Sequence, residues 1–356
     1  MLEEILSQDQ LSSHLENTYS AQVQSISKLD WSVYHIKLTS QTTGSESWVA
    51  RVYRPEHEPA IESLIQFLSH LDQQGYPVEE CINSPITLSE NPKACILVTK
   101  FISGQRPERN RATFFRLGRL LGQLHAMPIP DNAPKGGAWH HLVIAGDIRD
   151  ECFAAARMLS DFEDRTRPMD QEISPFASEV QVLRHELAEL SATFERELPS
   201  SIVHPDFVPV NIIEHAASDE GNDGATNSQK KWTVVDWTGA GVGDRIVSLG
   251  FLLSVAAARG KMVLVDEVMK GYGEFVKLEE CELEVLPKTV YLRFFTLDCW
   301  QVAMGRKEPK VIAEGLKSFR DLGNNVAKHV RKILQSSPVP SGSMDDGNAE
   351  KIHVHR

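Results

Sequence analysis

Two short apolar stretches in the second half of the chain each lead to a carboxylate, and this pairing constrains the fold more than any other feature. Ser201–Val203 leads through His204 to Asp206, and Thr233–Val235 leads directly to Asp236. Short runs rich in β-branched residues favour strands, so both acids are expected at strand ends. A fold that brings these two strand ends together would collect their oxygen atoms in one place.

Asn211 lies five residues after Asp206 and adds an amide oxygen to the two carboxylates. Mg²⁺ prefers oxygen ligands of this kind, shared with the phosphates of a substrate. In phosphoryl transfer one carboxylate receives or orients the proton of the attacking hydroxyl, while an amide and a second carboxylate hold Mg²⁺ on the nucleotide. The His-x-Asp-x-x-x-x-Asn spacing that begins at His204, followed by Asp236, is that of a kinase catalytic loop and its metal-binding aspartate.

The two motifs together resemble the aminoglycoside phosphotransferase and choline kinase-like family. The chain reads VHPDFVPVNII from Val203 and WTVVDWTGAGVGD from Trp232. The family usually has His-Gly-Asp-x-x-x-x-Asn, followed by Ile-Asp-Trp and Gly-Asp. The resemblance covers most of the chain and implies an α+β, bilobal protein-kinase-like fold, with a small N-lobe of antiparallel sheet plus helix and a larger, mainly helical C-lobe. Protein kinases proper fit less well, because Trp237 replaces the Phe of Asp-Phe-Gly and no Ala-Pro-Glu segment follows.

This resemblance implies a role for each residue of the two motifs. Asp206 would be the catalytic base, and His204 would brace the catalytic loop through hydrogen bonds. Asn211 and Asp236 would bind Mg²⁺, with ATP or GTP as the phosphate donor. The acceptor would be a hydroxyl of a small molecule, such as an aminoglycoside-like antibiotic, an amino alcohol or a sugar, and the sequence leaves its identity open.

Arg51 lies in the predicted strand Ser47–Tyr53, where the resembled fold presents a cation to the nucleotide phosphates. A guanidinium can bind phosphate oxygens in a bidentate manner, which preserves the charge of a lysine with a different geometry. Glu58 or Glu62, near the start of a predicted helix, could pair with Arg51 as the helix glutamate of a kinase does. An exposed arginine on an edge strand is the alternative interpretation.

The apolar run Ala94–Ile102 predicts a strand that is closed by Ser103 and Gly104. It resembles the linker between the lobes of a kinase, whose backbone groups would hydrogen-bond the edge of the adenine. An ordinary buried strand explains the run nearly as well. The candidates for the adenine site are Val98, Thr99, Lys100 and Phe101.

Periodicity and the resemblance divide the chain into an N-lobe (1–97), a linker (98–104), a C-lobe (105–335) and a disordered tail (336–356). The polar segment 216–231 is predicted to be a mobile loop outside the active site. N-lobe strands are predicted near 21–27, 33–39 and 47–53, after a helix within 1–20 and before a helix at 59–74. C-lobe helices are predicted near 113–127, 148–163, 178–197, 246–258, 263–276, 285–304 and 310–334.

Composition excludes several classes of partner. The formal net charge is −12, which argues against binding to a nucleic-acid backbone. The five cysteines are scattered without Cys-x-x-Cys spacing, so we expect reduced thiols in a cytoplasmic protein and no structural zinc site. No apolar run is long enough for a membrane span, and the start of the chain lacks the features of a signal peptide. The oligomeric state stays open.

Three positions depart from the pattern of the resembled family. The chain has no glycine before Gly44, so no glycine-rich loop can clamp the phosphates. Pro205 stands where the family usually has glycine. Ser248 replaces the aspartate of a usual Asp-Leu pair, which removes a structural carboxylate and is expected to affect stability more than catalysis.

Histidines outside the motif are expected to be structural. His125 ends a predicted amphipathic helix and is interpreted as a structural histidine. His140 and His141 are adjacent, so their side chains point apart on a regular helix or strand and do not form a metal site. We expect them in a surface turn, with a role in the substrate pocket as the alternative.

Two other functions fit parts of the pattern. His204, Asp206, Asp236 and His215 could be ligands of a two-metal phosphohydrolase, although no other cluster supplies the remaining ligands. The missing glycines, Arg51 and Pro205 would also suit a catalytically inactive, kinase-like binding module. The presence of all three chemical groups favours an active enzyme.

Overall fold

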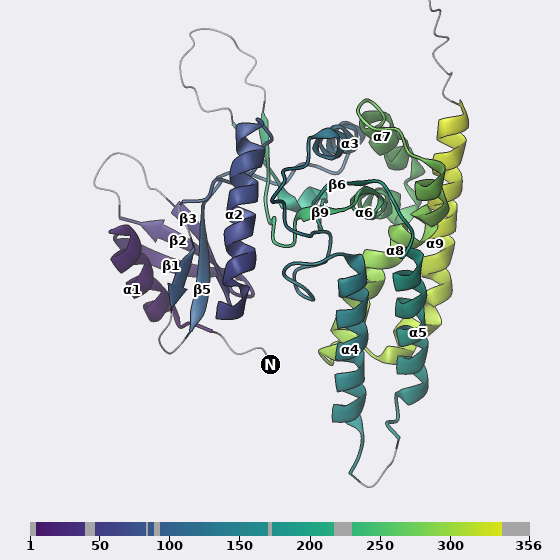
Figure 1. Ribbon diagram of the computed structural model, residues 1–356, viewed down its shortest axis with the longest axis horizontal. Helices are drawn as coiled ribbons and strands as arrows, with labels where there is room; N and C mark the ends of the chain where they lie inside the picture. Colours follow the sequence, from purple (N-terminus) through teal and green to yellow (C-terminus); the bar gives the residue numbers. More distant parts are fainter. Residues whose placement is uncertain are drawn as a thin grey trace, which may run out of the picture.

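The computed structural model describes residues 5–39, 47–82, 85–88, 93–169, 173–216 and 230–336. It has two lobes, a small one built on a sheet and a larger one built mainly of helices (Figure 1). This confirms the expected α+β, kinase-like architecture. The predicted loop at 216–231, apart from its first residue and last two, and the predicted tail beyond Ser336 lie outside the described residues.

The small lobe contains a five-stranded sheet in the order β1-β2-β3-β5-β4, and every neighbouring pair is antiparallel. Its strands agree with the predicted ones except for the three-residue β4, which the sequence analysis missed. Two helices and a 3₁₀ turn complete the lobe. The elements are α1 (Gln8–Tyr19), β1 (Val23–Asp30), β2 (Val33–Leu38), β3 (Ser47–Tyr53), η1 (Pro55–His57), α2 (Glu58–Gln73), β4 (Ile86–Leu88) and β5 (Ala94–Lys100).

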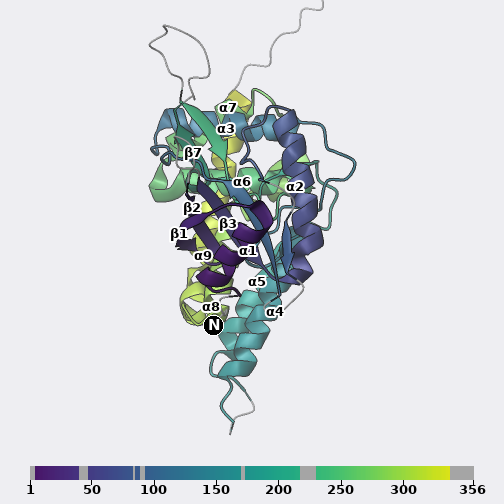
Figure 2. The same cartoon turned by 90° about the vertical axis from the view of Figure 1, so that its left-hand side faces the viewer.

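Alternation along the strands gives the sheet two different faces. One face packs against α1, which lies across the outer side of the sheet in Figure 2. The opposite face is turned toward the large lobe and carries Val33, Val49, Arg51 and Thr99. The sheet therefore presents a cation to the space between the lobes. The core on the α1 side consists of Leu6, Leu11, Leu15, Tyr34, Ile36, Leu38, Trp48, Ala50, Val52, Ala94, Ile96 and Val98.

The large lobe consists of seven α-helices and two small strand pairs within the described ranges. Side-chain caps define several helix starts, as where Asp147 accepts hydrogen bonds from the first turn of α4. The helices α4 and α5 form a long pair that projects from the lobe (Figure 1). The helices are α3 (Arg111–Ala126), α4 (Ile148–Thr166), α5 (Ala177–Thr193), α6 (Arg245–Ala257), α7 (Met262–Tyr272), α8 (Glu280–Ala303) and α9 (Pro309–Ser336), with the 3₁₀ turns η2 (Pro209–Asn211) and η3 (Ala258–Gly260).

The strand pairs place the two sequence motifs next to each other. The first pair is β6 (Ser200–Val203) with β9 (Gly241–Asp244), and the second is β7 (Ile212–His215) with β8 (Lys231–Val234). The first acidic motif connects β6 to β7, and the second connects β8 to β9. Both connections lie at the interface of the lobes, as the strand-end argument predicted.

All five cysteines are free thiols, as expected. In the part of the chain that the structure describes, no helix has both the length and the apolar character needed to cross a membrane.

His125 makes the stability of the large lobe depend on pH. Its Nδ1 lies 2.9 Å from the Tyr272 hydroxyl, which joins α3 to α7, and burial lowers the pKa of His125 to about 3. The unfolded chain binds a proton at this residue below about pH 6.5, whereas the folded chain does not until about pH 3. The stability that this group contributes is therefore complete above pH 6.5 and is lost as the pH falls.

We predict that His125→Phe makes the loss of stability between pH 7.5 and pH 5 smaller by the share that His125 contributes, while the other buried histidines keep theirs. Linkage gives a loss of about 2 kcal/mol at pH 5 from this residue in the unmodified protein. Urea unfolding at the two pH values measures the difference. A His185→Phe control on the exposed side of α5 should retain the unmodified slope, and the same slope in the His125 variant would contradict the account.

Candidate active site

His204 connects the two motifs through both of its ring nitrogens. Its Nδ1 accepts a hydrogen bond from the Asp206 backbone N–H (3.0 Å), so the proton resides on Nε2, which donates to the Val235 carbonyl (3.2 Å). Burial lowers the pKa of His204 to about 4, so the ring is neutral near pH 7. Trp237 packs edge-on against the ring. The arrangement is that of a bracing histidine whose nitrogens are both occupied.

Asp206 and Asn211 contact each other directly. The amide Nδ2 of Asn211 donates to the backbone carbonyl and to the carboxylate Oδ2 of Asp206, both at 2.9 Å. This leaves Asn211 Oδ1 as the atom that could bind a metal ion. Burial raises the pKa of Asp206 to about 6, and the positive charge of Arg293 opposes that shift. The carboxylate is thus more basic than an exposed aspartate.

Asp236 adopts a left-handed backbone conformation with φ of 66°. Aspartate tolerates this conformation better than most residues, and such positions cluster at functional sites. Val235, the residue before it, donates its N–H to the Asn211 carbonyl (2.9 Å), and Trp237 after it is buried with its indole N–H bonded to the Val234 carbonyl (2.8 Å). The sharp turn leaves Asp236 facing the space between the lobes.

Arg51 pairs with Glu79, a partner that the sequence analysis did not identify when it left Glu58 and Glu62 open as candidates. Arg51 Nη2 lies 3.0 Å from Glu79 Oε2, and the Thr99 hydroxyl donates to the same oxygen at 3.0 Å. The side chain of Arg51 is 10 % exposed and that of Glu79 4 %, so water screens this pair weakly. Arg51 therefore lies in the cleft and not on an exposed edge.

Glu79 reaches this position because its segment runs beside the second motif. The Pro77 carbonyl accepts a hydrogen bond from Val234 N–H (2.7 Å), and Val78 forms a parallel bridge with the same residue. Glu79 Oε1 then accepts the backbone N–H of Asp236 at 3.0 Å. One carboxylate thus joins the cation of the small lobe to the acid of the large lobe.

The four linker candidates differ in where they lie. Val98 packs into the core of the small lobe, and its carbonyl is hydrogen-bonded to Ile82 N–H, so it does not reach the cleft. Thr99 holds Arg51, while Lys100 lines the cleft and pairs with Glu80. Phe101 lines the cleft and stacks on His35 with ring centroids 4.1 Å apart. The correction follows from strand alternation, which turns every second side chain away from the cleft.

A cavity of about 360 Å³ lies between the lobes at these residues. Val33, Val49 and Arg51 line it from the sheet, and Ile213 and Val235 from the large lobe. Phe101, Ile102 and Gly104 close one end, and Asn211 and Asp236 lie on its wall. We call this the linker cavity.

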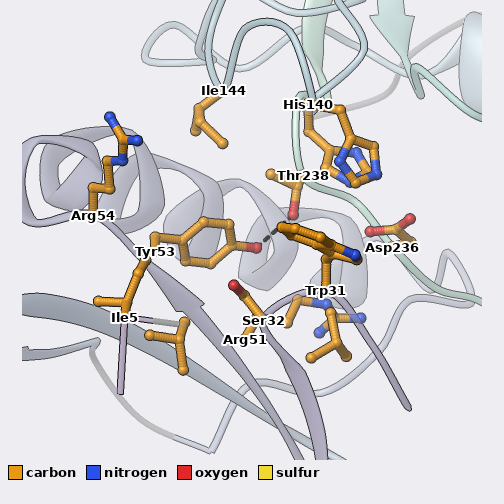
Figure 3. Close-up of a pocket in the computed structure, with 13 residues that line it drawn as sticks. Ile5, Trp31, Ser32, Arg51, Tyr53, Arg54, His140, Ile144, Asp236 and Thr238 are labelled. Carbon is orange, nitrogen blue, oxygen red and sulfur yellow. Dashed lines mark hydrogen bonds between the residues drawn. The ribbon is translucent and has the colours of Figure 1, made fainter. Parts of the chain in front are cut away.

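A second cavity of about 520 Å³ adjoins the linker cavity on the side of Arg51 and Asp236. Trp31, Ser32, Tyr53, Ile144 and Thr238 line it, and the hydroxyls of Tyr53 and Thr238 form a hydrogen bond of 2.7 Å (Figure 3). This hydrogen bond is a further polar link between the lobes, in addition to those made by Pro77 and Glu79. We call this the outer cavity.

His140 and His141 lie in a turn, as expected, with His140 half-buried and His141 exposed, and both residues also line the two cavities. The ring of His141 packs against those of His140 and Trp139, and Trp300 packs edge-on against Trp139. Burial lowers the pKa of both histidines to about 4. The alternative position, in a substrate pocket, agrees with the structure.

A buried ion pair that the sequence analysis missed supports the loop between His204 and Asn211. Arg293 on α8 pairs with Glu151 on α4, and both residues are almost fully buried. Arg293 Nη2 also donates to the carbonyls of Pro205 and Gly137, both at 3.0 Å. Glu151 accepts from Trp139 N–H (2.7 Å) and from the Thr296 hydroxyl (2.5 Å). The pair thereby holds the catalytic loop and the His140 segment together.

The oxygen atoms of Asn211 and Asp236 fit a Mg²⁺ ion better than a transition metal. Among the residues described, no group of three or more His, Cys, Asp or Glu side chains is placed to hold a metal ion. Mg²⁺ needs only one or two protein ligands when phosphates and water supply the others. Asn211 and Asp236 are therefore suited to a metal that arrives with a nucleotide.

We predict that Arg293→Met lowers the free energy of unfolding by about 3–5 kcal/mol, because Glu151 would remain buried without its partner. Arg196→Met is the matched control, since it removes the exposed partner of Glu284 and should cost less than about 1 kcal/mol. Denaturant titration measures both. Equal effects of the two substitutions would contradict a supporting role for the buried pair.

Comparisons with known proteins agree with this geometry. A model of the phosphotransferase enzyme family (APH) matches residues 27–283. No curated protein matches the chain. Among solved structures, the amicoumacin kinase hAmiN in complex with AMP-PNP, Ca²⁺ and its ligand Ami has a TM-score of 0.60 at 13% identity, over 90% of this chain and 94% of that one.

Two further kinases share the fold. A spectinomycin phosphotransferase solved with ADP and spectinomycin has a TM-score of 0.51 at 13% identity, over 93% of this chain and 99% of that one. The Plasmodium vivax ethanolamine kinase has a TM-score of 0.53 at 12% identity, over 86% of this chain and 81% of that one. Because the family model spans more than half of the sequence, the chain belongs to the phosphotransferase enzyme family, APH, and it has that family's protein-kinase-like fold.

Proposed function

We propose that this protein transfers the γ-phosphoryl group of ATP or GTP to a hydroxyl of a small molecule in a Mg²⁺-dependent reaction. One observation carries the proposal. The linker cavity collects Arg51, Asn211 and Asp236 from three separate segments, and Asn211 is hydrogen-bonded to Asp206. A cation, two metal ligands and a base are the groups that phosphoryl transfer requires. Family membership supplies the reaction class.

The apolar end of the linker cavity suits a nucleotide base. Val33 and Val49 lie on one wall, Ile213 on the other, and Phe101 closes the end. The N–H groups of Lys100 and Phe101 are already bonded to Glu80 and Ser47, so the polar edge of the base would meet the backbone one or more residues later, at Ile102–Gly104. The phosphates would then extend toward Arg51.

Asn211 Oδ1 and the Asp236 carboxylate would hold Mg²⁺ at the phosphate end. Bound there, the ion would neutralise negative charge on the phosphate oxygens. Glu79 keeps Arg51 and the Asp236 backbone in place, so the phosphate site is formed before the nucleotide binds. Such preorganisation reduces the free-energy cost of ordering the reactants.

Asp206 would act on the acceptor. Its carboxylate takes the proton of the acceptor hydroxyl while the hydroxyl oxygen forms a bond to the γ-phosphorus. The bond from that phosphorus to the bridging oxygen breaks, and the nucleoside diphosphate leaves with the bond electrons. Burial makes Asp206 a stronger base than an exposed aspartate, which suits this role.

The alternatives are less well supported. A two-metal phosphohydrolase would need His204 and His215 as ligands, yet both nitrogens of each ring already have hydrogen-bond partners. A loop from His204 to Asn211 that had lost its supporting hydrogen bonds would favour the inactive binding module. In place of the missing family aspartate, however, the Ser248 hydroxyl donates to the His204 carbonyl at 2.9 Å, so the loop remains supported.

We predict that Asp206→Asn and Asp236→Asn differ in effect. Asp206→Asn should lower turnover on the order of 10²–10⁴-fold and preserve nucleotide affinity, because only the base is lost. Asp236→Asn removes an anionic metal ligand, so Mg²⁺-dependent affinity and turnover should both decrease. Release of nucleoside diphosphate, measured over a panel of hydroxylated antibiotics, amino alcohols and sugars, gives turnover, and calorimetry gives affinity.

Asp164→Asn is the matched control, because this exposed acid lies near the end of α4, far along the chain from both motifs, and its salt bridge is with Arg167 at the surface. Loss of metal-dependent binding in Asp206→Asn with retention in Asp236→Asn would reverse the assignment. Binding of Mg²⁺-nucleotide without turnover of any compound would favour the binding module.

A further inference from the structure

The linker cavity and the outer cavity meet at a shared wall. The shared side chains include Arg51 and Asp236, which the proposed function assigns to the phosphates and the metal. His140 is also shared, and it is labelled among the residues that line the outer cavity (Figure 3). A group transferred from a nucleotide in the linker cavity to an acceptor in the outer cavity would pass this wall.

His140 has an unused hydrogen-bonding atom there. Its Nδ1 is buried and has no partner among the described residues. Buried polar atoms are rarely left unpaired, and one that lines a binding cavity is a candidate for contact with a ligand. The residue that carries this nitrogen lines both the linker cavity and the outer cavity.

The ion pair of Glu151 and Arg293 holds the backbone next to His140 and the backbone next to Asp206. Glu151 accepts the N–H of Trp139, next to His140, and Arg293 donates to the carbonyl of Pro205, next to Asp206. Arg293 also donates to Gly137. Because the ion pair joins these segments, it fixes the position of His140 relative to Asp206. His141 adds support by stacking on His140 with ring centroids 4.1 Å apart.

We propose that the His140 imidazole donates a hydrogen bond to the phosphoryl group during its transfer, and that the Glu151–Arg293 pair positions it opposite Asp206. This inference rests on the proposed function and adds to it a residue outside the two sequence motifs. Arg51 and His140 would then contact the moving phosphoryl group from the small and the large lobe respectively. A donor of this kind acts by stabilising charge that develops in the transition state.

The test compares the binding of Mg²⁺-ADP with that of Mg²⁺-ADP plus tetrafluoroaluminate, a planar mimic of the transferred phosphoryl group. In the unmodified protein, tetrafluoroaluminate should tighten nucleotide binding. His140→Phe should lose about 10- to 100-fold of that gain, because one charge-assisted hydrogen bond is missing. His140→Asn places an amide near the position of Nδ1 and should recover part of the gain.

Affinity for Mg²⁺-ADP alone is the internal reference, because the gain from tetrafluoroaluminate is calculated for each protein relative to its own Mg²⁺-ADP affinity, and measurable binding of Mg²⁺-ADP reports correct folding. The inference is overturned if His140→Phe keeps the full gain, or if tetrafluoroaluminate adds nothing in the unmodified protein. Failure of the unmodified protein to bind Mg²⁺-ADP would instead refute the proposed function itself. The two failures are thus distinguished by one set of titrations.

Discussion

The carboxylate of Glu79 is the contact on which the arrangement of the cleft depends. One oxygen binds Arg51 and Thr99 of the sheet, and the other accepts the backbone N–H of Asp236 in the large lobe. All of these groups are shielded from water, so the charge of Arg51 is balanced by one fixed partner. A buried cation without a partner would be strongly destabilising. Glu79 therefore both permits a cation in the cleft and orients the turn that carries Asp236, the metal ligand that we propose.

The large lobe uses a second buried pair for an equivalent purpose. Arg293 on α8 donates to the carbonyls of Pro205 and Gly137, and Glu151 on α4 accepts the N–H of Trp139. The loop that carries Asp206 is thereby bonded to helix α8 and, through the ion pair, to helix α4. Hydrogen bonds from His204 then connect this loop to the second motif. The reacting groups are consequently held by two ion pairs and one neutral histidine, and a nucleotide would find them already in place. Positioning of this kind is the main contribution of a protein to phosphoryl transfer.

The sequence predicted what depends on local pattern. Spacing selected Asp206, Asn211 and Asp236 as candidates, and periodicity located most helices and strands within a few residues. It did not predict the partner of Arg51, because Glu79 is placed by pairing of its segment with Val234, more than 150 residues away. Arg293 and Glu151 were missed for the same reason. Neither lies in a motif, and the sequence does not show that these two charged residues on different helices form a pair. Val98 was a candidate through its backbone groups, and the sequence could not show that its carbonyl is already bonded to the N–H of Ile82.

The central claim is that the cleft is a binding site for a metal–nucleotide complex. Calorimetric titration of AMP-PNP into the unmodified protein, with Mg²⁺ and with a chelator in its place, tests the claim most directly. The account predicts saturable one-to-one binding with Mg²⁺ and much weaker binding without it, because Asn211 and Asp236 act through the metal while Arg51 acts on the phosphates. Absence of binding in both titrations, or equal binding in both, would contradict the account.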